Sequence, residues 1–300
     1  TIPSRWIVWV HSMAMWVAVL MTLTLGAVGI PMVKLNNGVE MPVLAFAAEV
    51  WEPDVCKSAT SMALEAGFRF IWSSTLVGDD CQKAQKEAIE ESKISRDELF
   101  IAGTVNDPKC SDMKDCYLQT KQGAEKQFAL LGQKQLDMLM LDYPADENCD
   151  SIRGQWKAFE EIYAAKRVRS IAVSNFNLKQ LQCLKNSTVP VVNQMRYAVG
   201  HGHDPVVQQD EGLGIHVQAY SPLAKGQLAK DPLCSKIGQV HGKSAVQVAL
   251  KWILQRGVAV ATQSTSLDHL KSDLDLFDFE LTDDEMKQLN DYSPSTALMV

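Results

Sequence analysis

The sequence of 300 residues has no CxxC pair, no His and Cys at zinc-ligand spacing, and no basic run longer than two residues. The first two absences exclude the common zinc modules, and the HGH triplet at 201–203 is more typical of a polar loop than of metal ligation. The third absence, together with a net charge of −7, argues against a nucleic-acid-binding surface. With 46% hydrophobic residues, the chain can bury a large core.

Charge is also missing from residues 6–33, which contain no Asp, Glu, Lys or Arg. At about 1.5 Å per residue, a helix of this length would cross a hydrocarbon core of about 30 Å. Trp6, Trp9 and Trp16 stand where interface anchors belong. A cleaved signal peptide and a buried helix are the alternatives. The run predicts one transmembrane helix as an anchor over residues 1–32.

No glycine-rich loop follows the first expected strand, which disfavours a doubly wound sheet. Eight short apolar runs alternate instead with amphipathic stretches, and this order predicts an α/β fold, a parallel (β/α)8 TIM barrel over residues 33–300. Asn37 and Gly38 predict a β-hairpin ahead of the barrel. The eight runs are Val43–Ala47, Phe70–Trp72, Leu99–Gly103, Met138–Leu141, Ser170–Val173, Val191–Gln194, His216–Ala219 and Ala259–Thr262.

Four segments late in the chain resemble successive motifs of the aldo-keto reductases: SIAVSNFNLKQL, VVNQMRY, QAYSPLAKGQL and LDLFDFELTDDEM. GFRFI, DELFIAGTV and QLDMLMLDYP fall into register ahead of them, so the resemblance covers nearly all of residues 33–293. It implies a nicotinamide cofactor, usually NADPH, at the C-terminal mouth of the barrel, and reduction of aldehydes or ketones. In that family a Tyr donates the proton, a Lys paired with an Asp tunes the Tyr, and a His orients the carbonyl.

None of these four catalytic groups stands at its matching position. The resemblance puts Trp72 at the position of the Asp, Val77 at that of the Tyr, Thr104 at that of the Lys and Asp142 at that of the His. General acid catalysis needs an ionisable group of tuned pKa, so the sequence predicts a degenerate barrel, a pseudoenzyme. Asp142 and the neighbouring Tyr143 leave open a substitute acid.

The residues that bind the cofactor in that family are only partly retained in this sequence. Two cations of the 2′-phosphate clamp are lost and a carboxylate is gained, which opposes an anionic phosphate. We therefore expect no tightly bound cofactor and at most weak binding of NAD(P)H. The retained residues are interpreted first as shaping tight turns, with a structural or sensing nucleotide as the alternative. The retained residues are Ser174, Asn175, Gln194, Tyr220, Ser221, Leu223 and Ser264, and the altered clamp positions are Gln263, His269 and Asp273.

Seven cysteines leave at least one unpaired within the chain. Cys110–Cys116 and Cys56–Cys81 could pair in an oxidising lumen, but the sequence favours unrelated thiols near the barrel mouth, Cys149 among them. The NST triplet at 186–188 is a glycosylation sequon, which has meaning only in the secretory pathway.

The loss of the catalytic groups and the uncharged run together predict a non-catalytic, membrane-anchored protein. It would be an accessory or structural subunit of an organellar membrane protein complex, single-pass in the plastid thylakoid or mitochondrial inner membrane. Its partners would be the lipid bilayer and other subunits, contacted through residues 6–33 and the barrel surface. The alternative is a membrane-tethered NAD(P)H-dependent oxidoreductase or an NAD(P)H-sensing subunit.

Overall fold

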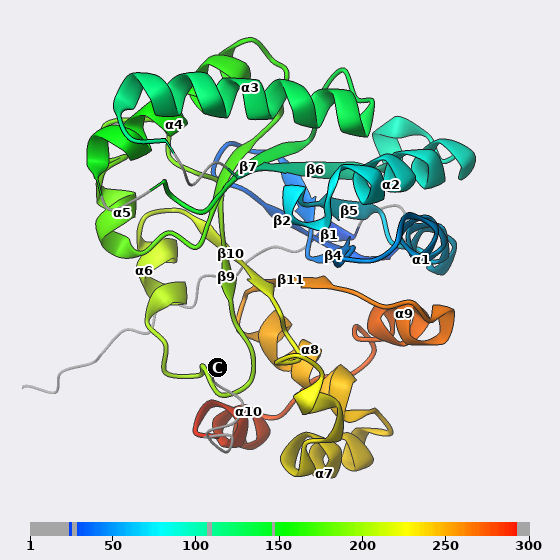
Figure 1. The fold of residues 1–300 in the computed structure, drawn as a ribbon. Coiled ribbons are helices and arrows are strands. Elements are labelled where there is room, and N and C mark those ends of the chain that lie inside the picture. Colours follow the sequence, from blue (N-terminus) through cyan, green and yellow to red (C-terminus); the bar gives the residue numbers. More distant parts are fainter. Residues whose placement is uncertain (1–23, 26–28, 107–109, 146–147, 293–300) are drawn as a thin grey trace, which may run out of the picture.

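Eight parallel strands form a closed barrel in the computed structural model, which describes residues 24–25, 29–106, 110–145 and 148–292. The strands follow chain order around the barrel, and the last pairs with the first (Figure 1). All eight predicted apolar runs are confirmed as strands. They are β4 Leu44–Ala47, β5 Phe70–Ser73, β6 Phe100–Val105, β7 Met138–Asp142, β8 Ile171–Ser174, β9 Val192–Arg196, β10 His216–Tyr220 and β11 Ala259–Thr262.

Helices surround the barrel and bury one face against it (Figure 1). In α8, for example, Ser244 and Gln247 form a capping box at the start, and Val248 and Trp252 are fully buried. The helices are α1 Pro53–Ala66, α2 Asp79–Glu91, α3 Met113–Leu131, α4 Cys149–Ala164, α5 Leu178–Gln182, α6 Val206–Gly212, α7 Pro232–His241, α8 Ala245–Gln255, α9 Leu267–Leu274 and α10 Asp283–Asn290.

The predicted hairpin is confirmed and closes the amino end of the barrel. It consists of β2 Pro31–Lys34 and β3 Glu40–Pro42, which pair antiparallel. The Asn36 amide donates hydrogen bonds of 2.9 Å to the carbonyl oxygens of Pro190 and Gly214, which precede β9 and β10. The opposite, carboxyl end of the strands is therefore the mouth, where barrel enzymes place their chemistry.

The predicted transmembrane helix is not found in the part of the chain that the structure describes. Its last part is strand instead, since β1 Thr24–Leu25 pairs antiparallel with β2. Within the described ranges, no helix combines the length and the apolar character needed to span a bilayer. Residues 1–23 and 26–28 of the predicted anchor lie outside the described residues. The membrane location and the bilayer and subunit partners stay predictions.

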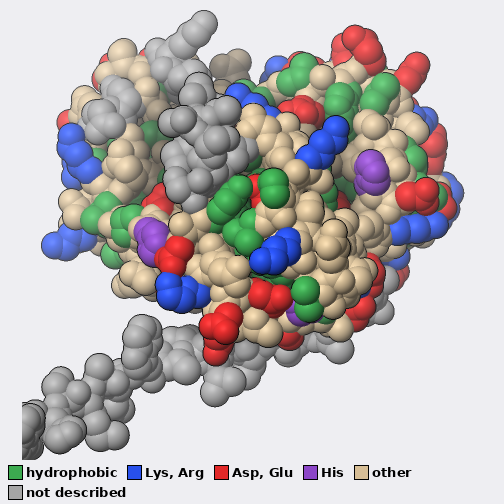
Figure 2. Space-filling view, turned by 90° about the horizontal axis from the view of Figure 1, so that it is seen from below, with side chains coloured by type: hydrophobic (Ala, Val, Ile, Leu, Met, Phe, Trp, Pro, Cys, Tyr) green, Lys and Arg blue, Asp and Glu red, His purple; other side chains and the backbone are tan. Residues whose placement is uncertain are grey.

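The molecular surface carries mixed charge on the face drawn in Figure 2. Lys and Arg side chains there are scattered among Asp and Glu side chains, and the coloured part of that face shows no gathered basic patch. Nucleic-acid binding usually needs such a patch. The expectation that no nucleic acid binds stays a prediction.

Strand register determines which side chains point into the barrel. Ser73 donates to Gln85 of α2 at 2.7 Å and Asn193 donates to Asp210 of α6 at 2.8 Å, so these positions face outward. Neighbouring residues of a strand point to opposite faces. The adjacent residues Trp72 and Gln194 therefore point inward, and the residues that pair with them in register share this inner face near the mouth. These residues are Ala47 and Ala102 beside Trp72, and Asp142, Ser174 and Gln218 on the side of Gln194.

Below the mouth, a buried carboxylate joins three segments at the amino ends of the strands. Asp137 forms an ion pair with Arg96 at 2.7 Å and accepts hydrogen bonds from Arg169 and from the Ile101 N–H at 2.8 Å each. We expect Asp137→Ala to lower the free energy of unfolding by about 3 kcal/mol, because two guanidinium groups and a buried N–H lose their acceptor. Urea unfolding at neutral pH measures this loss.

Glu87→Ala is the control for that experiment, because Glu87 forms an exposed ion pair with Lys57. Its urea midpoint should stay at the wild-type value. Equal midpoints for the Asp137 and Glu87 variants would show that the buried cluster does not stabilise the fold.

Candidate functional site

A polar layer lines the mouth of the barrel on the inner face of the strands. Trp72 is the last but one residue of β5, whereas Asp142 ends β7, Ser174 ends β8 and Tyr220 ends β10. Because parallel strands end at the same edge, residues far apart in the chain meet there.

Trp72 is buried in this layer, with 9% of its surface exposed. Its indole Nε1 has no hydrogen-bond partner among the described residues, and the same holds for Nε2 of Gln218 on the opposite side of the interior. Buried N–H groups are normally paired. Two unpaired donors on the inner face therefore leave places for the oxygen atoms of a ligand.

Val77 does not belong to the mouth layer. It ends the short 3-10 helix η1 Thr75–Val77 and packs in a separate apolar cluster with Ala48, Cys81 and Ala84. A proton donor at this position in the observed backbone would face α1 and α2, away from the inner layer. The resemblance to the family matched Val77 to the position of the tyrosine, but it could not indicate where the side chain points.

Thr104 faces inward and holds the loop that contains η1. Its hydroxyl oxygen accepts a hydrogen bond of 2.9 Å from the Thr75 N–H and lies 3.2 Å from the Thr75 hydroxyl oxygen. Of the four positions that match the family's catalytic groups, Trp72, Thr104 and Asp142 therefore share the inner face, and only Asp142 can ionise.

Asp142 is the buried acid of the mouth, with 3% of its surface exposed. Burial raises its pKa to about 6, and a hydrogen bond with Ser174 opposes the rise. The next residue, Tyr143, has a left-handed backbone with φ of 67° and is 41% exposed. A carboxyl group of this pKa and a phenol on the rim are thus adjacent.

Asn175 connects the strand ends on the other side of the mouth. Its amide donates to the Ser174 hydroxyl at 2.9 Å, and its side-chain oxygen accepts from the Tyr220 hydroxyl at 2.9 Å. Tyr143 is hydrogen-bonded to Tyr220 in turn, and burial is the main cause that raises the pKa of Tyr220. The backbone of Asn175 is left-handed, with φ of 60°.

Inside this network, Gln194 is held by a direct side-chain contact: its amide donates to Gln218 Oε1 at 2.8 Å. The mouth therefore brings together Ser174, Asn175 and Gln194, which match the family's carboxamide-binding residues, and Tyr220, which matches the aromatic residue that stacks on the nicotinamide ring.

The loop after β10 has an unusual backbone. Ser221, Ala224 and Lys225 have φ values of 50°, 47° and 57°, and Gly226 follows with 84°. Left-handed residues other than glycine cost about 1–3 kcal/mol each, and such strain gathers at functional sites. Leu223 packs against the core within this loop. The loop that carries the retained residues Ser221 and Leu223 thus has a constrained conformation.

The predicted 2′-phosphate clamp lies around the start of α9. Gln263 donates a hydrogen bond to Glu49, and Ser264 Oγ accepts from the Ser266 N–H at 3.1 Å. His269 is exposed. Asp273, by contrast, is buried and accepts a hydrogen bond of 2.9 Å from Thr262. Its carboxyl group faces the barrel wall, so it opposes a phosphate less than the sequence suggested.

The structure adds three residues that sequence reasoning missed. Arg196 pairs in register with Tyr220, Gln218 pairs with Gln194, and Glu49 contacts Gln263. The period of two along a strand could have found Arg196, which stands two residues after Gln194. Glu49 had no signal, because its partner lies 214 positions away.

Comparisons with known proteins decide the family. The sequence model of the aldo/keto reductase family matches residues 51–293. The uncharacterized oxidoreductase YtbE of Bacillus subtilis is 31% identical over 261 residues, which cover 85% of this chain and 90% of that protein. The chain belongs to the aldo/keto reductase family. The glyoxal reductase of Bacillus subtilis is 30% identical, with 86% of this chain and 91% of that protein covered.

Solved structures agree with this family. The aldo/keto reductase of Brucella melitensis superposes with a TM-score of 0.79 at 28% identity, over 87% of this chain and 98% of that one. The aldo-keto reductase of Bombyx mori, solved in complex with NADP, has a TM-score of 0.76 at 26% identity, over 87% of this chain and 92% of that one.

These relatives overturn the predicted function. A non-catalytic accessory or structural subunit of an organellar membrane complex is wrong, because the similar proteins are oxidoreductases and reductases. The four altered catalytic positions led to the error, because they received more weight than the substitute acid left open at Asp142, whose raised pKa follows from its burial in the fold. The alternative prediction, an NAD(P)H-dependent oxidoreductase, agrees better with the relatives.

The buried carboxyl group of Asp273 predicts a dependence of stability on pH. Burial raises the pKa of Asp273 to about 7, whereas an unfolded Asp has a pKa of about 4. Between these values the folded state binds more protons than the unfolded state, so the free energy of unfolding falls as pH rises. We expect Asp273→Asn to lose less stability than wild type between about pH 5.5 and about pH 8. Urea midpoints at the two pH values test this, and equal losses in both proteins would contradict it.

Proposed function

We propose that this protein is an NAD(P)H-dependent oxidoreductase of carbonyl compounds, with its nucleotide site at the mouth of the barrel. The observation that carries the proposal is the inner layer of the mouth, where an acid of raised pKa lies among hydrogen-bond donors without partners. Relatives named glyoxal reductase and morphine 6-dehydrogenase support this reaction class.

The residues present fit a nicotinamide dinucleotide. Ser174, Asn175 and Gln194 offer hydroxyl and amide groups to a carboxamide, and Tyr220 offers an aromatic face. The unpaired Nε2 of Gln218 supplies a buried donor directly behind Gln194. When bound, the reduced nicotinamide supplies the hydride. The relative from Bombyx mori was solved with NADP, which supports a nucleotide at this end of the fold.

Asp142 is the proton donor of this proposal. Its pKa of about 6 keeps part of the carboxyl group protonated near neutral pH, which is the condition for a general acid. Tyr143 and Tyr220, hydrogen-bonded to each other at the rim, position a carbonyl oxygen toward it. The unpaired Nε1 of Trp72 offers a further donor to the oxygen as it gains negative charge.

The clamp favours NADH at least as well as NADPH. Gln263 stands where the family has a lysine, and it is hydrogen-bonded to the Glu49 carboxylate. A carboxylate near this position repels a 2′-phosphate but can accept a hydrogen bond from a ribose hydroxyl.

Asp142→Asn separates catalysis from nucleotide binding. We expect a loss of about 100-fold or more in NADH-dependent reduction of glyoxal, because the amide cannot donate the acid's proton. NADH affinity, measured by quenching of tryptophan fluorescence, should stay within about twofold of wild type, since no positive charge is removed. In the wild-type protein, kcat should fall as pH rises above about 6, where Asp142 deprotonates.

Asp210→Asn is the matched control, because burial raises the pKa of Asp210 to about 6 as well, and Asp210 bonds to Asn193 on the outer side of the barrel. This variant should keep the wild-type rate and pH profile. Full activity in Asp142→Asn would remove Asp142 from the mechanism. NADH binding without turnover by the wild-type protein would replace the proposal by the NAD(P)H-sensing alternative.

A further inference from the structure

Six of the seven cysteines form three disulfides. Cys56–Cys81 joins α1 to α2, Cys110–Cys116 closes a loop onto the first turn of α3, and Cys149–Cys183 joins α4 to the end of α5. Their Cα separations are 5.5, 4.8 and 5.1 Å, all within the usual range of about 4.4–6.8 Å. Disulfides persist in oxidising compartments and are rare in the cytosol.

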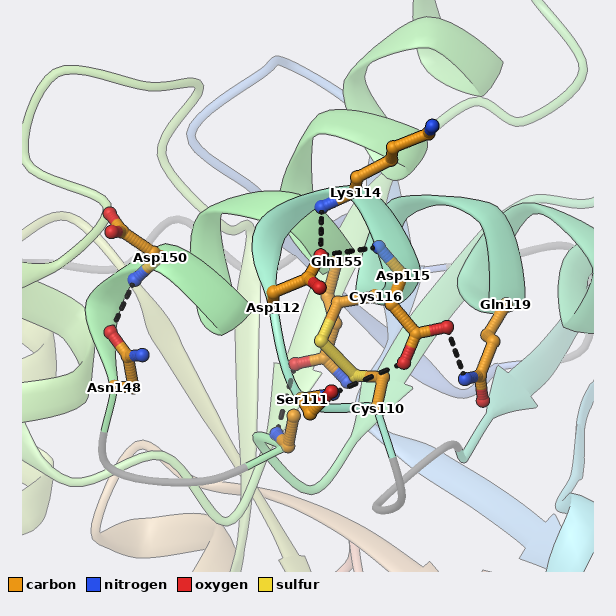
Figure 3. The surroundings of a disulfide bond; sticks show 11 residues. Cys110, Ser111, Asp112, Lys114, Asp115, Cys116, Gln119, Asn148, Asp150 and Gln155 are labelled. Atoms are coloured by element: carbon orange, nitrogen blue, oxygen red, sulfur yellow. Dashed lines mark hydrogen bonds between the residues drawn. A yellow bond between two sulfur atoms is a disulfide. The ribbon is translucent and has the colours of Figure 1, made fainter.

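The bonds are built into ordered surroundings. Figure 3 shows Cys110–Cys116 at the start of α3, where the Asp112 carboxylate accepts from the N–H groups of Lys114 and Asp115 at 2.9 Å each. The remaining thiol, Cys234, is buried in α7. Two pairings that the sequence left open are therefore formed, and the fold adds the third.

The sequon at 186–188 lies on the turn between α5 and β9, three residues after a disulfide-bonded cysteine. Asn186 and Thr188 are both exposed. The backbone of Thr188 is fixed from both sides, because its N–H donates to Glu160 at 2.7 Å and its carbonyl accepts from the Trp156 indole at 2.9 Å. The sequon thus has an ordered backbone and side chains open to solvent.

This turn lies toward the amino end of the barrel. Pro190, two residues after Thr188, accepts a hydrogen bond from Asn36 of the hairpin that closes that end. The mouth is at the opposite end. A large group on Asn186 would therefore leave the mouth accessible.

We propose that Asn186 carries an N-linked glycan, added in the oxidising lumen of the secretory pathway where the three disulfides form. The Asn186 amide nitrogen bonds to C1 of a sugar, the C1–O bond to a lipid-linked pyrophosphate breaks, the lipid pyrophosphate leaves, and the amide loses one proton. Each disulfide forms by exchange with an oxidised protein disulfide, which leaves as a dithiol with the two electrons and two protons. The site is independent of the proposed oxidoreductase activity.

The test uses the full chain isolated from its own cells and from a eukaryotic secretory host. Treatment with an amidase that cleaves N-linked glycans should lower the mass of the wild-type protein. Asn186→Gln and Thr188→Ala should lack the shift, whereas Thr188→Ser should keep it, because a serine hydroxyl also completes the sequon. Two variants at different residues guard against a folding defect in either one.

A thiol count on the same wild-type sample completes the test. The denatured, unreduced protein should expose one reactive thiol, Cys234, and all seven cysteines should react only after reduction. Wild-type protein from its own cells that shows no mass change on amidase treatment would overturn the proposal. Seven reactive thiols without reduction would overturn it equally.

Discussion

Closure of the barrel is the constraint on which the rest of the structure depends. Pairing of β11 with β4 completes the ring, and the two-residue period of each strand then sets every side chain either inside or outside. Asp142, Ser174, Gln194 and Gln218 face one another because their strands pair in register. A slip of one residue in any of these strands would turn its polar residue toward the helices.

Burial in this layer gives the site its chemistry. Among the described residues, no cation is in direct contact with Asp142 to lower its pKa; the principal effect is desolvation, which raises it to about 6. In the proposed mechanism, one carboxyl group of raised pKa takes the part of the family's tyrosine and lysine. The disulfides link consecutive loops around the same mouth: Cys56–Cys81 joins the helices after β4 and β5, and Cys149–Cys183 joins the segments after β7 and β8. They restrain the rim that holds the layer.

The fold could be predicted from local patterns, because each strand is a short apolar run and the hairpin has an Asn-Gly turn. The predicted transmembrane anchor could not be tested by such local patterns, because an uncharged apolar run can form a helix or a strand, and residues 24–25 form a strand. The positions matching the family's cofactor and catalytic residues could be found from the sequence, but the directions of Val77 and Asp273 could not. The direction of the Val77 side chain is set by packing against α1 and α2, and that of Asp273 by its hydrogen bond with Thr262. Cys149–Cys183 spans 34 positions and follows only from the assembled fold.

Transfer of deuterium from NADH to a carbonyl carbon tests the central claim most directly. The full chain would be incubated with NADH labelled at C4 of the nicotinamide and with glyoxal, and the alcohol product would be analysed by mass spectrometry. We expect one deuterium on the carbinol carbon of the product, with the hydroxyl proton derived from the solvent through Asp142. Absence of deuterated alcohol while NADH is bound at saturation would contradict the assignment of this barrel as an oxidoreductase.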